Sequence, residues 1–133
     1  MKVTGTEIVF TWKERRNGIS SLKRAKKLFA GGKNWTTGTF REELEDGTAN
    51  FCSIGAVNEA NGAGEPIAIS ALNCALHKGD FLSLEDLLDG GLYTDSFVID
   101  FNDSLYEQTD YKLVSNLFDS AVKILKRGSY KLN

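Results

Sequence analysis

The feature that most constrains the fold is a stripe of apolar residues near the end of the sequence. It recurs at three- and four-residue intervals, through Leu113, Val114, Leu117, Phe118, Ala121, Val122 and Leu125. Such spacing places the side chains on one face of a helix, which Thr109 can cap and Gly128 can end. We therefore expect a helix from Thr109 to about Arg127, with Leu117 at the centre of its buried stripe.

Shorter elements are predicted along the rest of the chain. Alternating apolar residues at Ile8, Phe10 and Trp12 predict a strand over 6–12, and Asn17-Gly18 is typical of a turn. The later patterns predict a helix from Ser20 or Ser21 to Gly31-Gly32, a hairpin over 35–44 and 48–52 with its tip at Asp46-Gly47, helices over 53–60 and from Pro66 to Gly79, a capped turn starting at Ser83, and a strand over 96–101.

Together these elements predict one α+β domain over residues 1–133, with three or four helices packed on a small, mainly antiparallel sheet. The hydrophobic content of 41% is sufficient for a core. No apolar run approaches the roughly 18 residues needed to span a membrane, and the first residues lack the apolar stretch of a signal peptide. We therefore expect a cytoplasmic protein.

Charge is unevenly distributed along the chain, although the net charge is only -2. Residues 13–33 contain eight Lys or Arg and one acid, whereas residues 41–110 contain fifteen acids and two bases. A segregated pattern of this kind can indicate the chemistry of a partner.

The acidic middle of the chain predicts contact with a protein that has a basic surface. Its candidate binding residues are the carboxylates of the hairpin and of the capped turn: Glu42, Glu43, Glu45, Asp46, Glu85, Asp86 and Asp89. Solubility alone is the alternative explanation for these charges.

The basic segment 13–33 is a second candidate surface, which could bind nucleic acid weakly. Its cations could contact phosphates, and Trp12 and Trp35 on either side could stack on bases. The sequence pI near 5.4 argues against a dedicated nucleic-acid binder and favours a solvated helix face.

A thiol-dependent enzyme is another alternative. Cys52 lies where a strand is expected to give way to a helix, and a helix N-terminus can activate a thiol. His77 is the only histidine and could act as its base, oriented by Asp103. A buried, packing thiol is the simpler interpretation of Cys52, and also of Cys74, while the helix C-terminus is sufficient to explain His77.

No cofactor or metal site is predicted. Asp100, Asn102 and Asp103 do not fit an EF-hand and are more typical of an Asx-turn at a strand end. The glycine-rich stretches match neither nucleotide-binding loop motif.

Three short motifs occur in order along the chain: Asn34-Trp35-Thr-Thr-Gly38-Thr39, then Phe51-Cys52-Ser53-Ile54-Gly55-Ala56-Val57, then Phe101-Asn102-Asp103 before an amphipathic helix. Over about residues 20–127 this order resembles a small uncharacterised domain family of phages and actinobacteria, with residues 1–18 as an added strand and turn. Phe101 stands where that family more often has Trp.

The resemblance implies a phage or mobile-element context. It marks Trp35, Gly38, Cys52, Gly55, Asn102 and Asp103 as mainly structural positions. We therefore predict a non-enzymatic, acidic protein-binding module, for example an inhibitor of a host defence protein or of a host protein that handles nucleic acid.

Overall fold

The computed structural model describes residues 1–62 and 65–132 of the chain. It is α+β, as predicted, but six segments of these residues are α-helices, which is more than the three or four expected. The elements are β1 (Lys2–Val3), β2 (Glu7–Val9), α1 (Trp12–Leu28), η1 (Ala30–Gly32), β3 (Arg41–Glu43), β4 (Ala49–Phe51), α2 (Ser53–Asn61), α3 (Pro66–Lys78), α4 (Leu84–Asp86), η2 (Leu87–Gly91), α5 (Ser96–Asp103), η3 (Gln108–Asp110), α6 (Tyr111–Arg127) and β5 (Ser129–Lys131).

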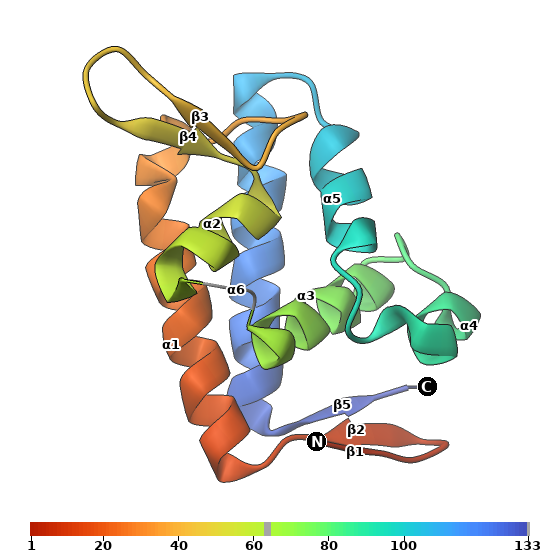
Figure 1. Ribbon diagram of the computed structural model, residues 1–133. Coiled ribbons are helices and arrows are strands. Elements are labelled where there is room, and N and C mark those ends of the chain that lie inside the picture. Colours follow the sequence, from red (N-terminus) through yellow and green to blue (C-terminus); the bar gives the residue numbers. More distant parts are fainter. Residues whose placement is uncertain (63–64, 133) are drawn as a thin grey trace.

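The two longest helices, α1 and α6, lie side by side and form the centre of the molecule (Figure 1). Helix α3 packs against both, and α2 packs against α1. The predicted stripe of α6 faces this core, where Val114, Phe118 and Leu125 are buried together with Leu22 of α1. Burial of this stripe is the main apolar contribution of α6 to stability.

Two small antiparallel sheets lie at opposite ends of the helical layer (Figure 1). At one end β2 is the central strand between β1 and β5, and Ile8 pairs with Tyr130. At the other end β3 and β4 form the predicted hairpin, in which Glu42 pairs with Asn50. The second sheet projects from the helices, whereas the first joins the two ends of the described chain.

Residues 96–101 belong to helix α5, so the predicted strand is wrong. The same segment also has the spacing of one helix face, because its residues recur four positions apart: Phe97 with Phe101, and Val98 with Asn102. A short apolar run fits both periods, and the side chains of Val98 and Asn102, both fully buried, show which one the fold uses.

Helix α1 begins at Trp12, eight residues before the predicted start, and it includes the supposed turn at Asn17-Gly18. Thr11 caps it, and Glu14 completes a capping box with the Thr11 backbone. A Cβ on Gly18 would lie 2.7 Å from a methyl carbon of Leu125. Gly18 therefore permits close packing of α1 on α6 and does not form a turn.

The first hairpin strand is shorter than predicted, since β3 begins at Arg41 and not at residue 35, whereas α2 and α3 are close to their expected bounds. Helix α6 begins at Tyr111 after a short 3-10 turn, so Thr109 is not its cap, whereas Gly128 ends it with a positive φ of 84°. Ser83 caps α4 through the backbone N–H of Asp86. Among the described residues, no helix combines the length and the apolar character that crossing a membrane requires.

Candidate functional site

The three sequence motifs meet at the side chain of Asn102, which is completely buried. Its Oδ1 accepts hydrogen bonds from Trp35 Nε1 at 2.8 Å, from the Ser53 backbone N–H at 3.0 Å and from Ser53 Oγ at 2.7 Å. Its Nδ2 donates to the Thr36 carbonyl at 3.0 Å. We call Trp35, Thr36, Ser53, Asn102 and Asp103 the Asn102 cluster.

Asp103 extends this cluster to the loop before the hairpin. One carboxylate oxygen accepts the Gly38 N–H at 2.9 Å and lies 3.3 Å from Asn102 Nδ2. The aromatic-Asn-Asp motif at the end of α5 thus ties the Trp-containing loop to the start of α2. Both polar atoms of the buried Asn102 side chain are hydrogen-bonded to protein groups, so the cluster holds three chain segments together.

Cys52 is the N-cap of α2, and its Sγ accepts the Gly55 N–H at 3.3 Å. The residue is only 3% exposed, and burial raises the pKa of its thiol. A Cβ on Gly55 would lie 1.8 Å from the Phe40 carbonyl oxygen, so only glycine lets the hairpin approach α2 this closely. The Cys-x-x-Gly motif therefore caps a helix and anchors the hairpin.

His77 lies elsewhere, in the last turn of α3, where its Nδ1 is 2.6 Å from the hydroxyl of Tyr130 in β5. Asp103 accepts from Gly38, and in the described part of the chain no hydrogen bond joins Cys52, His77 and Asp103. The structure therefore gives the side chains of these three residues separate hydrogen-bond partners, and the described residues do not form the predicted Cys52–His77–Asp103 triad. Cys74 is also buried, which raises its pKa to about 12.

Residues 1–62 and 65–132 contain no group of three or more His, Cys, Asp or Glu side chains arranged to hold a metal ion. The oxygen of Asn102 accepts three hydrogen bonds from protein groups, and Asp103 accepts one from Gly38. The Asx-turn expected at a strand end is also wrong, because these residues end a helix.

The acidic candidates divide into two groups, all of them exposed. Glu42, Glu43, Glu45 and Asp46 lie on the acidic hairpin, which we define as residues 41–48. Glu85, Asp86 and Asp89 lie on and after α4 and form the α4 patch. Figure 1 shows the hairpin and α4 on opposite sides of the molecule, so one partner surface of ordinary size would not cover both.

Internal contacts shape the acidic hairpin without removing its charge. Arg41 donates to Glu43 and to Glu59 of α2, each at 2.9 Å, and hydrogen bonds to these carboxylates raise its pKa. Asp46 accepts the hydroxyl and the backbone N–H of Thr48 at 2.6 and 3.0 Å, and these bonds lower the pKa of its carboxyl. Asp46 therefore stabilises the turn, and Glu42, although exposed, accepts a hydrogen bond from the Asn50 amide at 2.9 Å.

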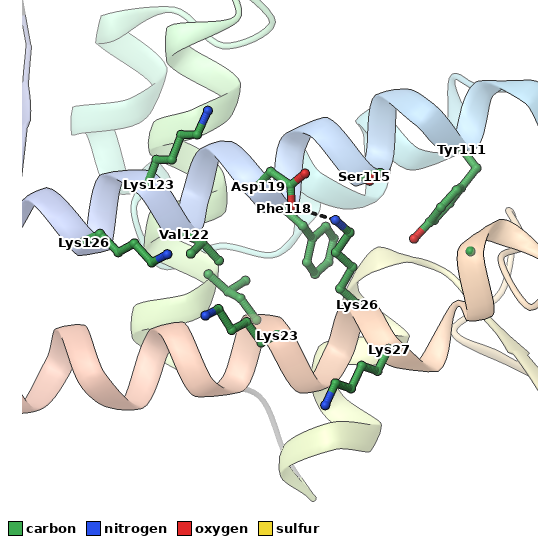
Figure 2. A pocket seen from close by; sticks show the side chains of 12 residues that line it. Lys23, Lys26, Lys27, Tyr111, Ser115, Phe118, Asp119, Val122, Lys123 and Lys126 are labelled. Carbon is green, nitrogen blue, oxygen red and sulfur yellow. Dashed lines mark hydrogen bonds and ion pairs between the residues drawn. The ribbon is translucent and has the colours of Figure 1, made fainter.

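Most cations of the basic segment 13–33 lie on the exposed face of α1, and lysines of α6 lie beside some of them. An open hollow of about 750 Å³ is lined by α1 and α6, and we call it the lysine groove. Figure 2 shows the side chains that line it. Its cationic lining comes from both helices: Lys23, Lys26 and Lys27 of α1, and Lys123 and Lys126 of α6. The contribution of α6 cannot be recognised from the sequence, because the two helices are about a hundred residues apart in the chain.

Comparison of the chain with protein-family models, with curated proteins and with solved structures found no match. The resemblance to a phage and actinobacterial domain family therefore stays a prediction. The function must be argued from the surfaces described above.

Proposed function

We propose that the protein is a non-enzymatic binding module whose acidic hairpin contacts a basic surface of a partner protein. The observation that carries this proposal is the combination of carboxylates with exposed apolar side chains on one projecting hairpin. Phe40 at its base is 51% exposed and Leu44 is 37% exposed, and residues 41–48 are all exposed. Solubility requires charge alone, whereas protein interfaces combine apolar anchors with a polar rim.

The anchoring of the hairpin favours recognition by a preformed surface. The Cys52 N–H donates to the Phe40 carbonyl, and Gly55 lets that carbonyl lie directly against α2. Arg41 adds the ion pair to Glu59. A partner would therefore meet a hairpin whose base is held in place, which reduces the entropy lost on binding.

The α4 patch provides an internal comparison. It also combines carboxylates with exposed apolar side chains, Leu84 and Leu88, but it wraps the end of the core through the buried Leu87. The hairpin projects from the molecule, which makes it accessible to a concave or flat partner. We therefore assign the primary contact to the hairpin.

The family resemblance supports a particular kind of partner. A small domain of phage type acts most directly by occupying a host protein, and an acidic surface competes for a basic site that would otherwise hold nucleic acid. The proposed role is thus inhibition of a host defence protein or of a host protein that handles nucleic acid.

Two variants with the same charge change test this assignment. The hairpin variant carries Glu42→Lys, Glu43→Lys and Glu45→Lys, and it keeps Asp46 because that side chain forms the turn. The control carries Glu85→Lys, Asp86→Lys and Asp89→Lys. Proteins captured from a bacterial lysate by the unmodified protein are identified and purified, and their direct binding is then measured over a range of salt concentrations.

The hairpin variant is expected to bind at least tenfold more weakly, mainly through slower association, while the α4 control retains binding. Affinity of the unmodified protein should fall as salt rises. Equal binding by the hairpin variant, or binding independent of salt, would refute the hairpin assignment.

A further inference from the structure

The cationic face of α1 and α6 has a charge that the proposed function does not use. We propose that the lysine groove is a binding site for single-stranded nucleic acid, with phosphates contacting its lysines and a base stacking on Trp12. This site is independent of the acidic hairpin and differs from the basic segment 13–33 in requiring α6.

The arrangement of cations is the first argument. Lys23, Lys27, Lys123 and Lys126 are exposed, and none of them forms an ion pair with any described residue. In Figure 2 Lys23 and Lys126 extend from facing helices toward the space between them, while Lys27 and Lys123 extend outward. A phosphate-bearing chain along this space would contact cations from both sides.

Neutralisation of the groove from within the protein is limited. Asp119 is the one acid that lines it, and its Oδ1 is committed to Lys26 Nζ at 2.7 Å. Lys23 and Lys27 are four residues apart on one helix, and Lys123 and Lys126 are three apart on the other, so like charges repel on both faces. A bound polyanion would remove this repulsion and release counterions.

The base of the groove offers little apolar surface to a ligand. Leu22 and Phe118, which line it, are fully buried, and Val122 is only partly exposed. A hollow of about 750 Å³ is within the range of small-molecule pockets and accommodates nucleotide-sized units. It is too small to enclose a duplex, because α1 and α6 pack directly on each other.

Trp12 supplies the second, independent argument for nucleic acid. It is 70% exposed, although a large aromatic side chain is ordinarily well buried. It lines an adjoining hollow of about 610 Å³ that shares Lys23, Lys27 and Lys126 with the lysine groove. The guanidinium carbon of Arg15 lies 5.7 Å from its ring, so the indole is part of the same cationic face.

An acidic peptide could satisfy the lysines equally well, but it would not use Trp12. Stacking of a base on an exposed indole requires no particular sequence and adds to the phosphate contacts. Single-stranded nucleic acid therefore accounts for both observations, because each nucleotide carries a phosphate and a flat base.

Binding is measured with a fluorescently labelled deoxythymidine oligomer of about 12 nucleotides, within the usual range of single-strand sites. The unmodified protein should bind it with an affinity that falls steeply between about 50 and 200 mM salt. Tryptophan fluorescence should be quenched on binding, and the quenching should come from Trp12 because Trp35 is buried.

The groove variant Lys23→Gln with Lys126→Gln is expected to bind at least tenfold more weakly and with a shallower salt dependence. Its control, Lys2→Gln with Lys78→Gln, removes the same charge from exposed lysines outside the groove and should bind as the unmodified protein does. Trp12→Ala should weaken binding at least fivefold and abolish the quenching. Circular dichroism confirms that each variant is folded.

Three results would overturn the proposal. Equal losses in the groove variant and its control would indicate non-specific attraction. Equal or tighter binding of a duplex, or of polyglutamate without quenching, would exclude a single-strand site. Markedly tighter oligomer binding by the hairpin variant than by the α4 control, with no loss in the groove variant, would place the oligomer on the hairpin, whereas failure of the hairpin assignment alone leaves the groove unaffected.

Discussion

The Asn102 cluster and the lysine groove use polar side chains in opposite ways. In the cluster, an amide with no solvent exposure has partners for its oxygen and its nitrogen. In the groove, four exposed lysines have no ionic partner among the described residues. Buried polar groups that are fully hydrogen-bonded hold a fold together, whereas concentrated unpaired charge adds little to stability and is available to a ligand.

The residue types that suggest catalysis in the sequence have structural roles in the fold, and the lysines that suggest only solvation surround the proposed binding site. Cys52 and Asp103 are residue types associated with catalysis, yet the structure uses both to cap and connect backbone segments. Lysines on a helix surface are ordinarily regarded as solvating groups. Here the packing of α1 against α6 brings lysines from two helices around one hollow.

Replacement of Asn102 is the largest test of this comparison. Asn102→Ala would leave three donors, on Trp35 and Ser53, without their acceptor in a buried site. Each unsatisfied buried group costs about 1–3 kcal/mol, so the free energy of unfolding should fall by at least about 3 kcal/mol. Urea unfolding measures the loss.

Asn50→Ala is the matched control for that change. The Asn50 amide donates to Glu42 and accepts a long hydrogen bond of 3.3 Å from Asn34 Nδ2. Neither Asn34 nor Asn50 is fully buried, so water can replace these bonds and the cost should be about 1 kcal/mol. If Asn102→Ala does not fold, Ser53→Ala is a milder change, because it removes only the hydrogen bond from Ser53 Oγ and keeps the one from the Ser53 backbone N–H. Similar losses of stability for Asn102→Ala and Asn50→Ala would show that the hydrogen bonds of the Asn102 cluster do not stabilise the fold.

Two leucines on α6 test the assignment of the core. Leu117 is 7% exposed and Leu113 is 47% exposed, although both belong to the predicted stripe. Leu117→Ala should lower the free energy of unfolding by about 2–5 kcal/mol, and Leu113→Ala by less than about 1 kcal/mol. Equal losses, measured by urea unfolding, would contradict the orientation of α6.

The outcome for α6 and α5 shows how far the sequence could predict this fold. Helix α6 has a stripe long enough that only the helical period fits it. The run 96–101 fits both periods, and the deciding residue, Asn102, is typical of a turn in sequence because a polar side chain does not itself indicate burial. Its spacing of four from Val98 was the available signal.

Other features depend on packing between distant segments and could not be predicted locally. Gly18 is typical of a turn in sequence, but its role is set by Leu125 of a helix that lies far along the chain. The lysine groove likewise requires knowledge that α1 and α6 are neighbours. The acidic hairpin was predictable because its strands and turn are local, and its tip lies at the expected Asp46-Gly47.

The buried thiol of Cys74 provides a test through pH. Its pKa is about 12 in the folded protein and close to the ordinary 9.0 when unfolded, so the folded state holds the proton more tightly. The stabilisation is complete below pH 9 and is lost as pH rises toward 12. At pH 10 the loss is about 1.4 kcal/mol.

Urea unfolding between pH 7 and pH 10 measures this effect, and Cys74→Ala should reduce the pH dependence by about that amount.

Native Cys52 and Cys74 should also react slowly with a thiol reagent and quickly in denaturant, because both are buried. Rapid labelling of Cys52 in the native protein would instead restore the thiol-enzyme hypothesis.

The smallest expected effect tests whether the unpaired lysines of the groove contribute to the free energy of unfolding. In Lys23→Gln with Lys126→Gln, repulsion from Lys27 and Lys123 decreases, so the free energy of unfolding should stay within about 0.5 kcal/mol of the original value or rise slightly. Added salt should stabilise the unmodified protein more than this variant, because salt screens the repulsion that the variant lacks. A loss above about 1 kcal/mol would mean that the lysine stems pack on Leu22 and Val122 as part of the core. The groove would then resemble the Asn102 cluster, and its lysines would be explained by stability without a ligand.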